Sequence, residues 1–199
     1  MLTAECCMFK RSLLLCLALA ASAQTKPAPT KATPSAEPTY RNSTFGFRYR
    51  VPYGWVDRTK EMQEGSDASK GEVLLAIFER PPQAAGETVN SAVVIAAENA
   101  ASYPGLKKAE DYLGPLAELT TSKGFKAEGD PSETQIDSRT LIRADFSKAL
   151  NEKLAMRQST LIMLAKGKIV SFTFIAGSAD AIDELIEGLG FSPAAARKN

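Results

Sequence analysis

The most regular alternation of apolar and polar residues lies near the end of the chain. Residues 168–176 alternate with period two, and serine and threonine separate the apolar positions. β-Branched and aromatic residues at this period favour a strand. Residues 153–165 are apolar at both parities towards their end, which predicts a central strand covered on both faces. A Lys166–Gly167 turn would join the two into a β-hairpin, because glycine tolerates positive φ. One face of the second strand contains Val170, Phe172 and Phe174.

A helix is predicted directly after this hairpin, over residues 178–188. Ser178 is a good N-cap, since its hydroxyl can accept a hydrogen bond from a free backbone N–H. Gly188 provides a stop. The apolar residues between them follow the i, i+3, i+4, i+7 pattern of a single stripe. These residues are Ile182, Leu185, Ile186 and Leu189. We therefore expect the helix to cover one face of the sheet that contains the hairpin.

Earlier segments show the same two patterns. A helix is expected over residues 106–122, with a kink where Gly114-Pro115 interrupts it, and a short helix near Asp57. Further strands are expected at residues 45–51, 72–79, 91–98, 125–128, 133–136 and 138–147. Sequential strands with helices before and after them predict an α+β fold. The expected form is a three-layer α/β/α sandwich around a mostly antiparallel sheet of about six to seven strands.

The beginning of the chain predicts export. Lys10 and Arg11 precede a short apolar run, and Ala21-Ser22-Ala23 fits a signal-peptidase site. The run is shorter than the roughly 20 residues that a membrane-spanning helix needs. Residues 1–23 are therefore expected to be a signal peptide, with either Met1 or Met8 as the start. We expect no transmembrane anchor after cleavage.

The rest of the chain divides into three predicted parts. Residues 24–39 contain four prolines among alanine, threonine, lysine and serine, which is typical of a disordered linker. Residues 40–192 form a single domain, and residues 193–199 a disordered tail. Trp55, the only tryptophan, is expected to plug the core beneath the loop that follows it.

Composition limits the chemistry. The three cysteines, Cys6, Cys7 and Cys16, all precede the predicted cut, so the exported domain would have no disulfide. The chain has no histidine, which excludes Cys–His and Ser–His–Asp nucleophile systems and zinc sites of the usual type. Phosphate-loop, dinucleotide and nucleophile-elbow motifs are absent too. We expect no catalytic residue of these kinds and no cofactor.

The net charge of the chain does not indicate a class of binding partner. The chain has 24 basic and 23 acidic residues, and removal of residues 1–23 leaves 22 of each. A neutral domain offers no general argument for nucleic acid or an anionic membrane as partner.

Two groups of charged residues remain as candidate sites. Four arginines fall on predicted strands and could form an anion-binding patch if their faces coincide: Arg48, Arg50, Arg143 and Arg157. Asp145 shares the parity of Arg143, so local ion pairs are the alternative. Five carboxylates between positions 57 and 72 could bind a hard cation, but they lack the spacing of a calcium loop and also fit a solvated loop. They are Asp57, Glu61, Glu64, Asp67 and Glu72.

The domain opens with a motif of moderate specificity for fold. Residues 40–55 read Tyr-x-Asn-x-x-x-Gly-Phe-x-Tyr-x-Val-Pro-x-Gly-Trp. This resembles the start of PsbP-like domains, a superfamily that includes the photosystem II subunit PsbP, a Ran-binding nuclear transport factor and bacterial periplasmic proteins of the DcrB type. The order of predicted elements supports the resemblance as far as residue 191. The resemblance implies a PsbP-like fold and a non-enzymatic binding or assembly role. It transfers no functional residue, and the metal-linked histidines of PsbP have no counterpart.

Together these observations predict an exported, non-catalytic binding or assembly factor of the cell envelope, located in the periplasm or outside the cell. Its partner would be an envelope protein. A carboxylate-based or metal-dependent hydrolase and a small-anion or lipid carrier are the alternatives. A deep pocket with converging carboxylates would favour the enzyme, and a shallow exposed surface the binding factor.

Overall fold

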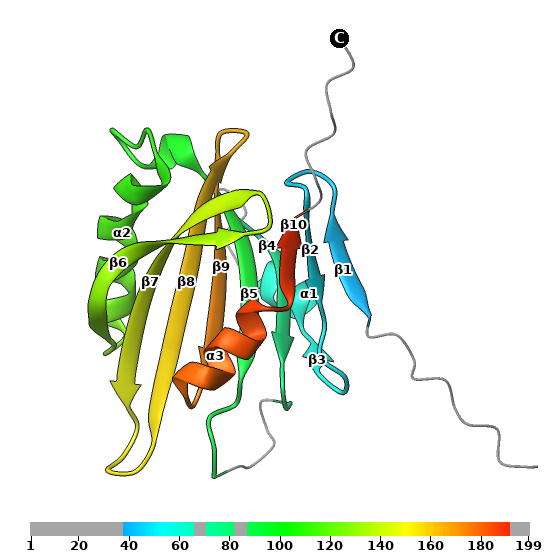
Figure 1. The fold of residues 1–199 in the computed structure, drawn as a ribbon, viewed down its shortest axis with the longest axis vertical. Coiled ribbons are helices and arrows are strands. Elements are labelled where there is room, and N and C mark those ends of the chain that lie inside the picture. The colour runs from blue at the N-terminus through cyan, green and yellow to red at the C-terminus, as the bar shows by residue number, and fades with distance from the viewer. Residues whose placement is uncertain (1–37, 66–70, 82–86, 192–199) are drawn as a thin grey trace, which may run out of the picture. The chain divides into compact units, whose positions relative to one another are not determined.

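One antiparallel sheet of seven strands dominates the computed structural model, which describes residues 38–65, 71–81 and 87–191 (Figure 1). The strand order is β3-β4-β5-β9-β8-β7-β6. The bounds are β3 (Val56–Asp57), β4 (Gly71–Phe78), β5 (Ala92–Asn99), β6 (Lys126–Ile136), β7 (Arg139–Ala149), β8 (Ala155–Ala165) and β9 (Lys168–Ala176). The expected α+β class and the antiparallel central sheet are confirmed.

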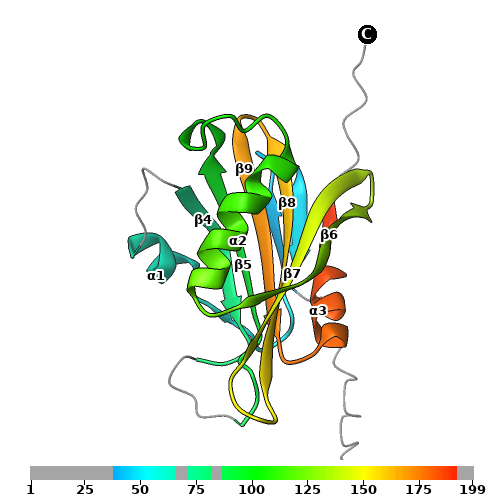
Figure 2. The same ribbon diagram turned by 90° about the vertical axis from the view of Figure 1, so that its left-hand side faces the viewer.

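Each face of this sheet has its own cover. Helix α2 (Leu113–Ser122) lies on one face, and α3 (Ala179–Ile186) on the other together with a second, three-stranded sheet (Figures 1 and 2). The second sheet has the order β1-β2-β10, with β1 (Thr39–Asn42), β2 (Phe47–Arg50) and β10 (Leu189–Phe191). The short helices are α1 (Thr59–Glu64) and the 3-10 turns η1 (Ala100–Ser102) and η2 (Ala109–Tyr112). One outer layer is thus part helix and part sheet.

The predicted hairpin and helix are present. Strands β8 and β9 are joined at Lys166 and Gly167, both with positive φ. The Ser178 hydroxyl accepts a hydrogen bond from Ala181 N at 3.2 Å and caps α3 as expected. Phe172 and Phe174 are fully buried. The sequence pattern alone therefore located the hairpin and its covering helix.

Two apolar clusters pack the sheet, one on each face. The larger lies beneath the second sheet and α3, where the Phe172 ring meets those of Phe47 and Phe191 at 5.1 and 6.0 Å. The smaller lies beneath α2 and η2 and includes Tyr112 and Phe146. Trp55 is half-buried at the margin of the larger cluster. The larger cluster joins the second sheet to the main sheet.

The predicted helix over residues 106–122 is wrong at its start. The α-helix begins at Leu113, so Pro115 lies in its first turn and does not kink it. A backbone N–H in the first turn has no intrahelical acceptor, so a proline is tolerated there. Leu119 of α2 is 52% exposed.

Strand predictions failed at several places, and β3 and β10 were not expected: Leu189, assigned to the helix stripe, lies in β10. The segments expected at residues 125–128 and 133–136 form one strand, β6, with a register shift between Glu128 and Ser132. Pro131 is tolerated there because β6 is an edge strand. Strand β1 was not expected, and it includes Thr39 from the predicted linker. Residues 1–37 and 193–199, with the predicted signal peptide, most of the linker and the tail, lie outside the described residues.

Candidate anion-binding site

A tight turn between β1 and β2 determines which side chains of the second sheet face outward. Asn42 Oδ1 accepts a hydrogen bond from Phe45 N at 3.0 Å, and Asn42 O accepts one from Gly46 N at 2.9 Å. Gly46 has φ of +73°, which favours glycine. The asparagine and glycine of the opening motif therefore close a hairpin and set its register.

That register places arginines directly opposite one another or beside one another. Arg41 of β1 is the cross-strand partner of Arg48 of β2, and Thr39 is the partner of Arg50. Phe47 and Tyr49 point inward and are buried, so the residues that alternate with them point outward. We call the outward side chains of Arg41, Arg48 and Arg50 the arginine face.

A glycine in β10 makes room for one of these arginines. Gly190 is the cross-strand partner of Arg48, and a Cβ atom on it would lie 2.8 Å from Arg48 Nη2. The guanidinium therefore lies over the β10 backbone, where Arg48 Nη1 donates a hydrogen bond to Phe191 O at 3.3 Å. Such a contact orients the Arg48 side chain.

The turn between β6 and β7 reaches the same place from the main sheet. Asp137 Oδ2 accepts a hydrogen bond from Phe191 N at 2.7 Å and lies 3.8 Å from Arg48 Nη2. Asp137 has φ of +50°, a value that aspartate adopts more readily than most residues. This carboxylate fixes the second sheet to the main sheet and partly compensates the charge of Arg48.

The arginine face borders a hollow of about 190 Å³ at the end of α3. Its lining includes Thr39, Glu187 and the backbone of residues 188–190. Among the described residues Arg41 has no carboxylate at ion-pair distance, and its side chain is exposed. Like charges directly opposite each other destabilise a strand pair. An anion bound between them would relieve that repulsion.

A second hollow, of about 550 Å³, continues from the first and is lined by residues of β2 and α3. Arg50 and Gly188 line both hollows. The further lining residues are Tyr49, Pro52, Trp55, Glu184 and Leu185. We call this hollow the Trp55 groove.

A hydrogen bond connects β2 to α3 at the Trp55 groove. Tyr49 OH donates a hydrogen bond to Leu185 O at 3.0 Å and is fully buried. Burial raises the pKa of this hydroxyl well above its ordinary value, although the charge of Arg50 acts in the opposite direction. The hydroxyl therefore stays neutral and keeps β2 attached to α3.

The other two predicted arginines lie elsewhere, on β7 and β8. Arg143 Nε donates to both carboxylate oxygens of Asp145 at 3.0 Å, and its Nη1 donates to Asp183 of α3 at 3.0 Å. Arg157 pairs with Glu128 of β6. Burial acts to lower the pKa of Arg143, but the hydrogen bonds and charges of the two aspartates raise it. The local ion pairs considered from the sequence are present here.

The four arginines proposed from the sequence thus form two separate pairs. Arg48 and Arg50 share the arginine face, whereas Arg143 and Arg157 line a different hollow of about 250 Å³. Sequence reasoning missed Arg41, because β1 was not recognised. The Asn42–Gly46 turn was the available signal, since a hairpin there pairs Arg41 with Arg48.

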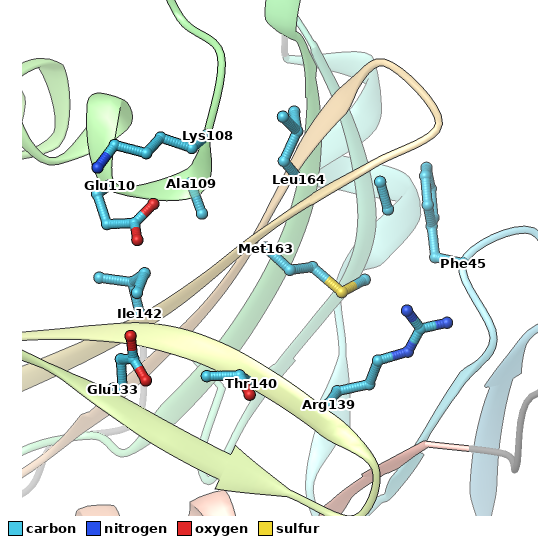
Figure 3. Close-up of a pocket in the computed structure, with 11 residues that line it drawn as sticks. Phe45, Lys108, Ala109, Glu110, Glu133, Arg139, Thr140, Ile142, Met163 and Leu164 are labelled. Atoms are coloured by element: carbon cyan, nitrogen blue, oxygen red, sulfur yellow. The ribbon is translucent and has the colours of Figure 1, made fainter.

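Another hollow, of about 360 Å³, lies between η2, the β6–β7 hairpin and the tip of the β8–β9 hairpin. Figure 3 shows Met163 near its centre, with Arg139 and Phe45 to one side and Glu110 and Glu133 to the other. Two cations and two acids line it: Lys108, Arg139, Glu110 and Glu133. Because both signs are present in equal number, this hollow does not select an anion as the arginine face does.

Two tyrosines bind the carboxylate at the end of β5. Tyr112 OH donates to Glu98 Oε1 at 2.7 Å, and Tyr103 OH donates to Glu98 Oε2. Burial and the hydrogen bond to Glu98 raise the pKa values of both tyrosines. This cluster connects the 3-10 turns to the main sheet and gives Glu98 a structural role.

The carboxylates between positions 57 and 72 do not assemble in the described part of the chain. Asp57 Oδ1 accepts from Thr59 N at 2.8 Å at the start of α1, and Glu61 pairs with Arg58. Asp67 lies outside the described residues. Within residues 38–65, 71–81 and 87–191, no three metal-ligating side chains gather at one point. No helix in the same ranges is long and apolar enough to cross a membrane.

Comparison with known proteins supports the fold. No protein-family model and no curated protein matches the sequence. The solution structure of cyanobacterial PsbP from Synechocystis superposes with a TM-score of 0.51 at 13% identity, over 83% of this chain and 99% of that one. The chain has a PsbP-like fold.

Weaker similarities extend to other proteins. The Ran-binding protein Mog1p of Saccharomyces cerevisiae superposes with a TM-score of 0.46 at 10% identity, over 77% of this chain and 94% of Mog1p. LpqN of Mycobacterium tuberculosis, a protein involved in cell envelope biogenesis, gives 0.39 at 13% identity over 74% and 83% of the two chains. At such identities the PsbP-like likeness concerns the fold alone, so function must be argued from the arginine face.

Proposed function

We propose that this protein is an exported, non-catalytic binding factor of the cell envelope that binds an anionic group of its partner on the arginine face. The observation that carries the proposal is the direct cross-strand pairing of Arg41 with Arg48, with Arg50 beside them. Guanidinium groups match carboxylate and phosphate geometry with two parallel hydrogen bonds. Regular strands fix the backbone positions of these residues, so only their side chains need to order when an anion binds.

The sign of the local charge supports this assignment. Asp137 lies 3.8 Å from Arg48 and Glu187 borders the hollow, but Arg41 has no carboxylate at ion-pair distance among the described residues. By contrast, the guanidinium groups of Arg143 and Arg157 already have carboxylate partners. The arginine face is therefore the stronger candidate for an external anion.

The two alternatives have less support from the geometry. A carboxylate-based hydrolase would use Glu110 and Glu133 in the hollow of Figure 3, where Lys108 and Arg139 offset their charge. A lipid carrier would need an apolar cavity beside the arginines, whereas the charged residues Arg50 and Glu184 are part of the lining of the Trp55 groove there. A surface that binds a partner's anionic group needs neither.

Poly-L-glutamate and polyphosphate are suitable probes of the arginine face. We expect the exported protein to bind both, and Arg41→Gln/Arg50→Gln to weaken binding at least about tenfold, because each charge-assisted hydrogen bond contributes about 1.5–3 kcal/mol. Isothermal titration calorimetry measures the change. The matched control is Lys60→Gln/Lys126→Gln, which removes the same charge from two exposed lysines elsewhere. Equal weakening by both variants would show only a general effect of net charge and would contradict the proposal.

Export is tested separately. Sequencing of the N-terminus of the protein from the envelope fraction should give Gln24 as the first residue, since the cut is expected after Ala23. A protein that retains residues 13–20 would contradict release from the membrane.

A further inference from the structure

The arginine face and the Trp55 groove form one continuous surface. Both hollows include Arg50 and Gly188 in their linings, and Arg50 N donates a hydrogen bond to Gly188 O at 2.9 Å. Cations line one end of this surface, and Trp55 and Leu185 line the other together with Glu184. A ligand that covers both ends must combine negative charge with an apolar group.

We propose that the occupant is an extended acidic segment of a partner protein, which places one apolar side chain in the Trp55 groove and its carboxylates along the arginine face. This inference rests on the proposed function, because it assigns a chemical class to the anionic partner. Charge complementarity places the carboxylates of the segment on the arginine face, and the groove selects the apolar residue.

The residue types at the groove are those of protein interfaces. Tryptophan, tyrosine and arginine are concentrated at interface hot spots, where they lie close to small pockets. Tyr53 lies in the turn between Pro52 and Trp55, which both line the groove, and is 87% exposed; Gly54 beside it has φ of +80°. An exposed tyrosine on a short, constrained loop can pack on a ligand with little loss of conformational entropy.

A membrane surface fits this region less well than a peptide. Glu184 and Glu187 of the α3 end border the two hollows, and a sheet of anionic headgroups would repel both. An extended peptide can place its carboxylates on the arginines and leave a neutral residue beside Glu184. The concave groove also matches a single side chain better than a planar surface.

The chain's own proline-rich segment does not complement this surface. Residues 24–37 contain Lys26 and Lys31 but only one acid, Glu37. Cations of this segment would meet the arginines, so a segment from another protein is the better occupant.

Trp55 reports directly on the groove because it is the only tryptophan in the chain. The probe is the tryptophan-free peptide acetyl-Glu-Glu-Asp-Leu-Glu-Asp-Glu-amide, with a second peptide in which serine replaces leucine. We expect the leucine peptide to change the emission of Trp55 and to bind about tenfold more tightly, because its side chain is removed from water. If Trp55 does not respond and the two peptides bind equally, the inference is overturned while the proposed function stands.

Variants on each side of the groove sharpen the test. Tyr53→Ser should weaken binding of the leucine peptide about threefold or more, whereas Leu150→Ser, at another exposed apolar residue, should not. Glu184→Gln should strengthen binding about twofold to fivefold, and Glu118→Gln on α2 should not. Loss of affinity in Glu184→Gln would contradict the assigned orientation.

Vesicles of phosphatidylglycerol and phosphatidylcholine test the membrane as the competing partner. We expect the unchanged protein and the Arg41→Gln/Arg50→Gln variant to co-sediment with these vesicles to the same small extent. Strong co-sedimentation that needs these arginines, without binding of either peptide, would overturn the acidic segment as occupant and retain anion binding. Absence of any arginine-dependent binding, to peptides, polyanions or vesicles, would overturn the proposed function as well.

Discussion

Two surfaces of this protein contain arginines that differ in how closely acids pair with them. Arg143 and Arg157 lie on the main sheet, where Asp145, Asp183 and Glu128 are their ion-pair partners. Arg41, Arg48 and Arg50 lie on the second sheet, where Asp137 is 3.8 Å from Arg48 and Arg41 has no ion pair among the described residues. The first group joins strands and a helix of the same domain, and the second presents positive charge outward.

The difference shows why residue type alone is a poor guide to a site. Both groups are arginines at alternate positions of strands, and both line hollows of similar size. They differ in how closely neighbouring elements pair them with acids: Arg143 and Arg157 each have a carboxylate within 3.0 Å, whereas Asp137 lies 3.8 Å from Arg48 and Arg41 has no ion pair among the described residues. An arginine whose hydrogen-bonding capacity is already satisfied contributes to stability, whereas one placed opposite another arginine has capacity left for a ligand.

The largest contrast is expected in ligand binding. Arg41→Glu/Arg50→Glu should weaken the acidic leucine peptide by at least about a hundredfold, since two charge-assisted contacts become repulsive. Arg143→Gln/Arg157→Gln should change its affinity less than about twofold, because those side chains face internal partners. Fluorescence anisotropy with a labelled peptide measures both. Comparable losses in the two variants would remove the distinction between the groups.

The free energy of unfolding should depend on the ion-paired arginines of the main sheet. Arg143→Ala leaves Asp145 and Asp183 without their partner and should lower the free energy of unfolding by about 1–2 kcal/mol, a value reduced for partial exposure. Urea denaturation gives the change. A double-mutant cycle with Asp183→Asn isolates the contact between β7 and α3, and a coupling energy of zero would show that the contact contributes nothing.

Removal of the acid beside the arginine face should strengthen anion binding. Asp137→Asn retains an oxygen that can accept from Phe191 N but removes the negative charge 3.8 Å from Arg48. We expect the affinity for poly-L-glutamate to rise about twofold to fivefold, within the range for a single exposed charge. Asp130→Asn, on the same β6–β7 hairpin, is the control. An unchanged affinity in Asp137→Asn would mean that Arg48 does not contact the ligand.

The smallest expected effect is a gain in stability on replacing an arginine. Arg41→Thr should raise the free energy of unfolding by about 0.2–1 kcal/mol, because it removes a like charge directly opposite Arg48. The gain should shrink at high salt, which screens exposed charges. Thermal melts at low and high ionic strength measure it. If Arg41→Thr were destabilising at low salt, Arg41 would have a structural role that the arginine face does not explain.

Local patterns determined a large part of the fold. The alternation in residues 168–176, the turn at Lys166–Gly167 and the cap at Ser178 each depend on neighbours within a few positions, and each is present as predicted. The opening motif indicated the PsbP-like fold through its resemblance to the start of such domains, and its asparagine and glycines meet backbone requirements of one hairpin and one turn. Signals of this kind are readable in a single sequence since the interactions that they reflect are short in range.

Tertiary structure alone decided the state of each arginine. Arg143 meets Asp183 across 40 positions and Arg157 meets Glu128 across 29, so no local pattern assigns these partners. Arg48 lies over Gly190 and beside Asp137 only because β10 pairs with β2 and the β6–β7 turn reaches them. Periodicity gives the face of a strand on which a side chain lies, but the charge that it meets there is set by elements distant in sequence. The candidate site is therefore a property of the packed second sheet.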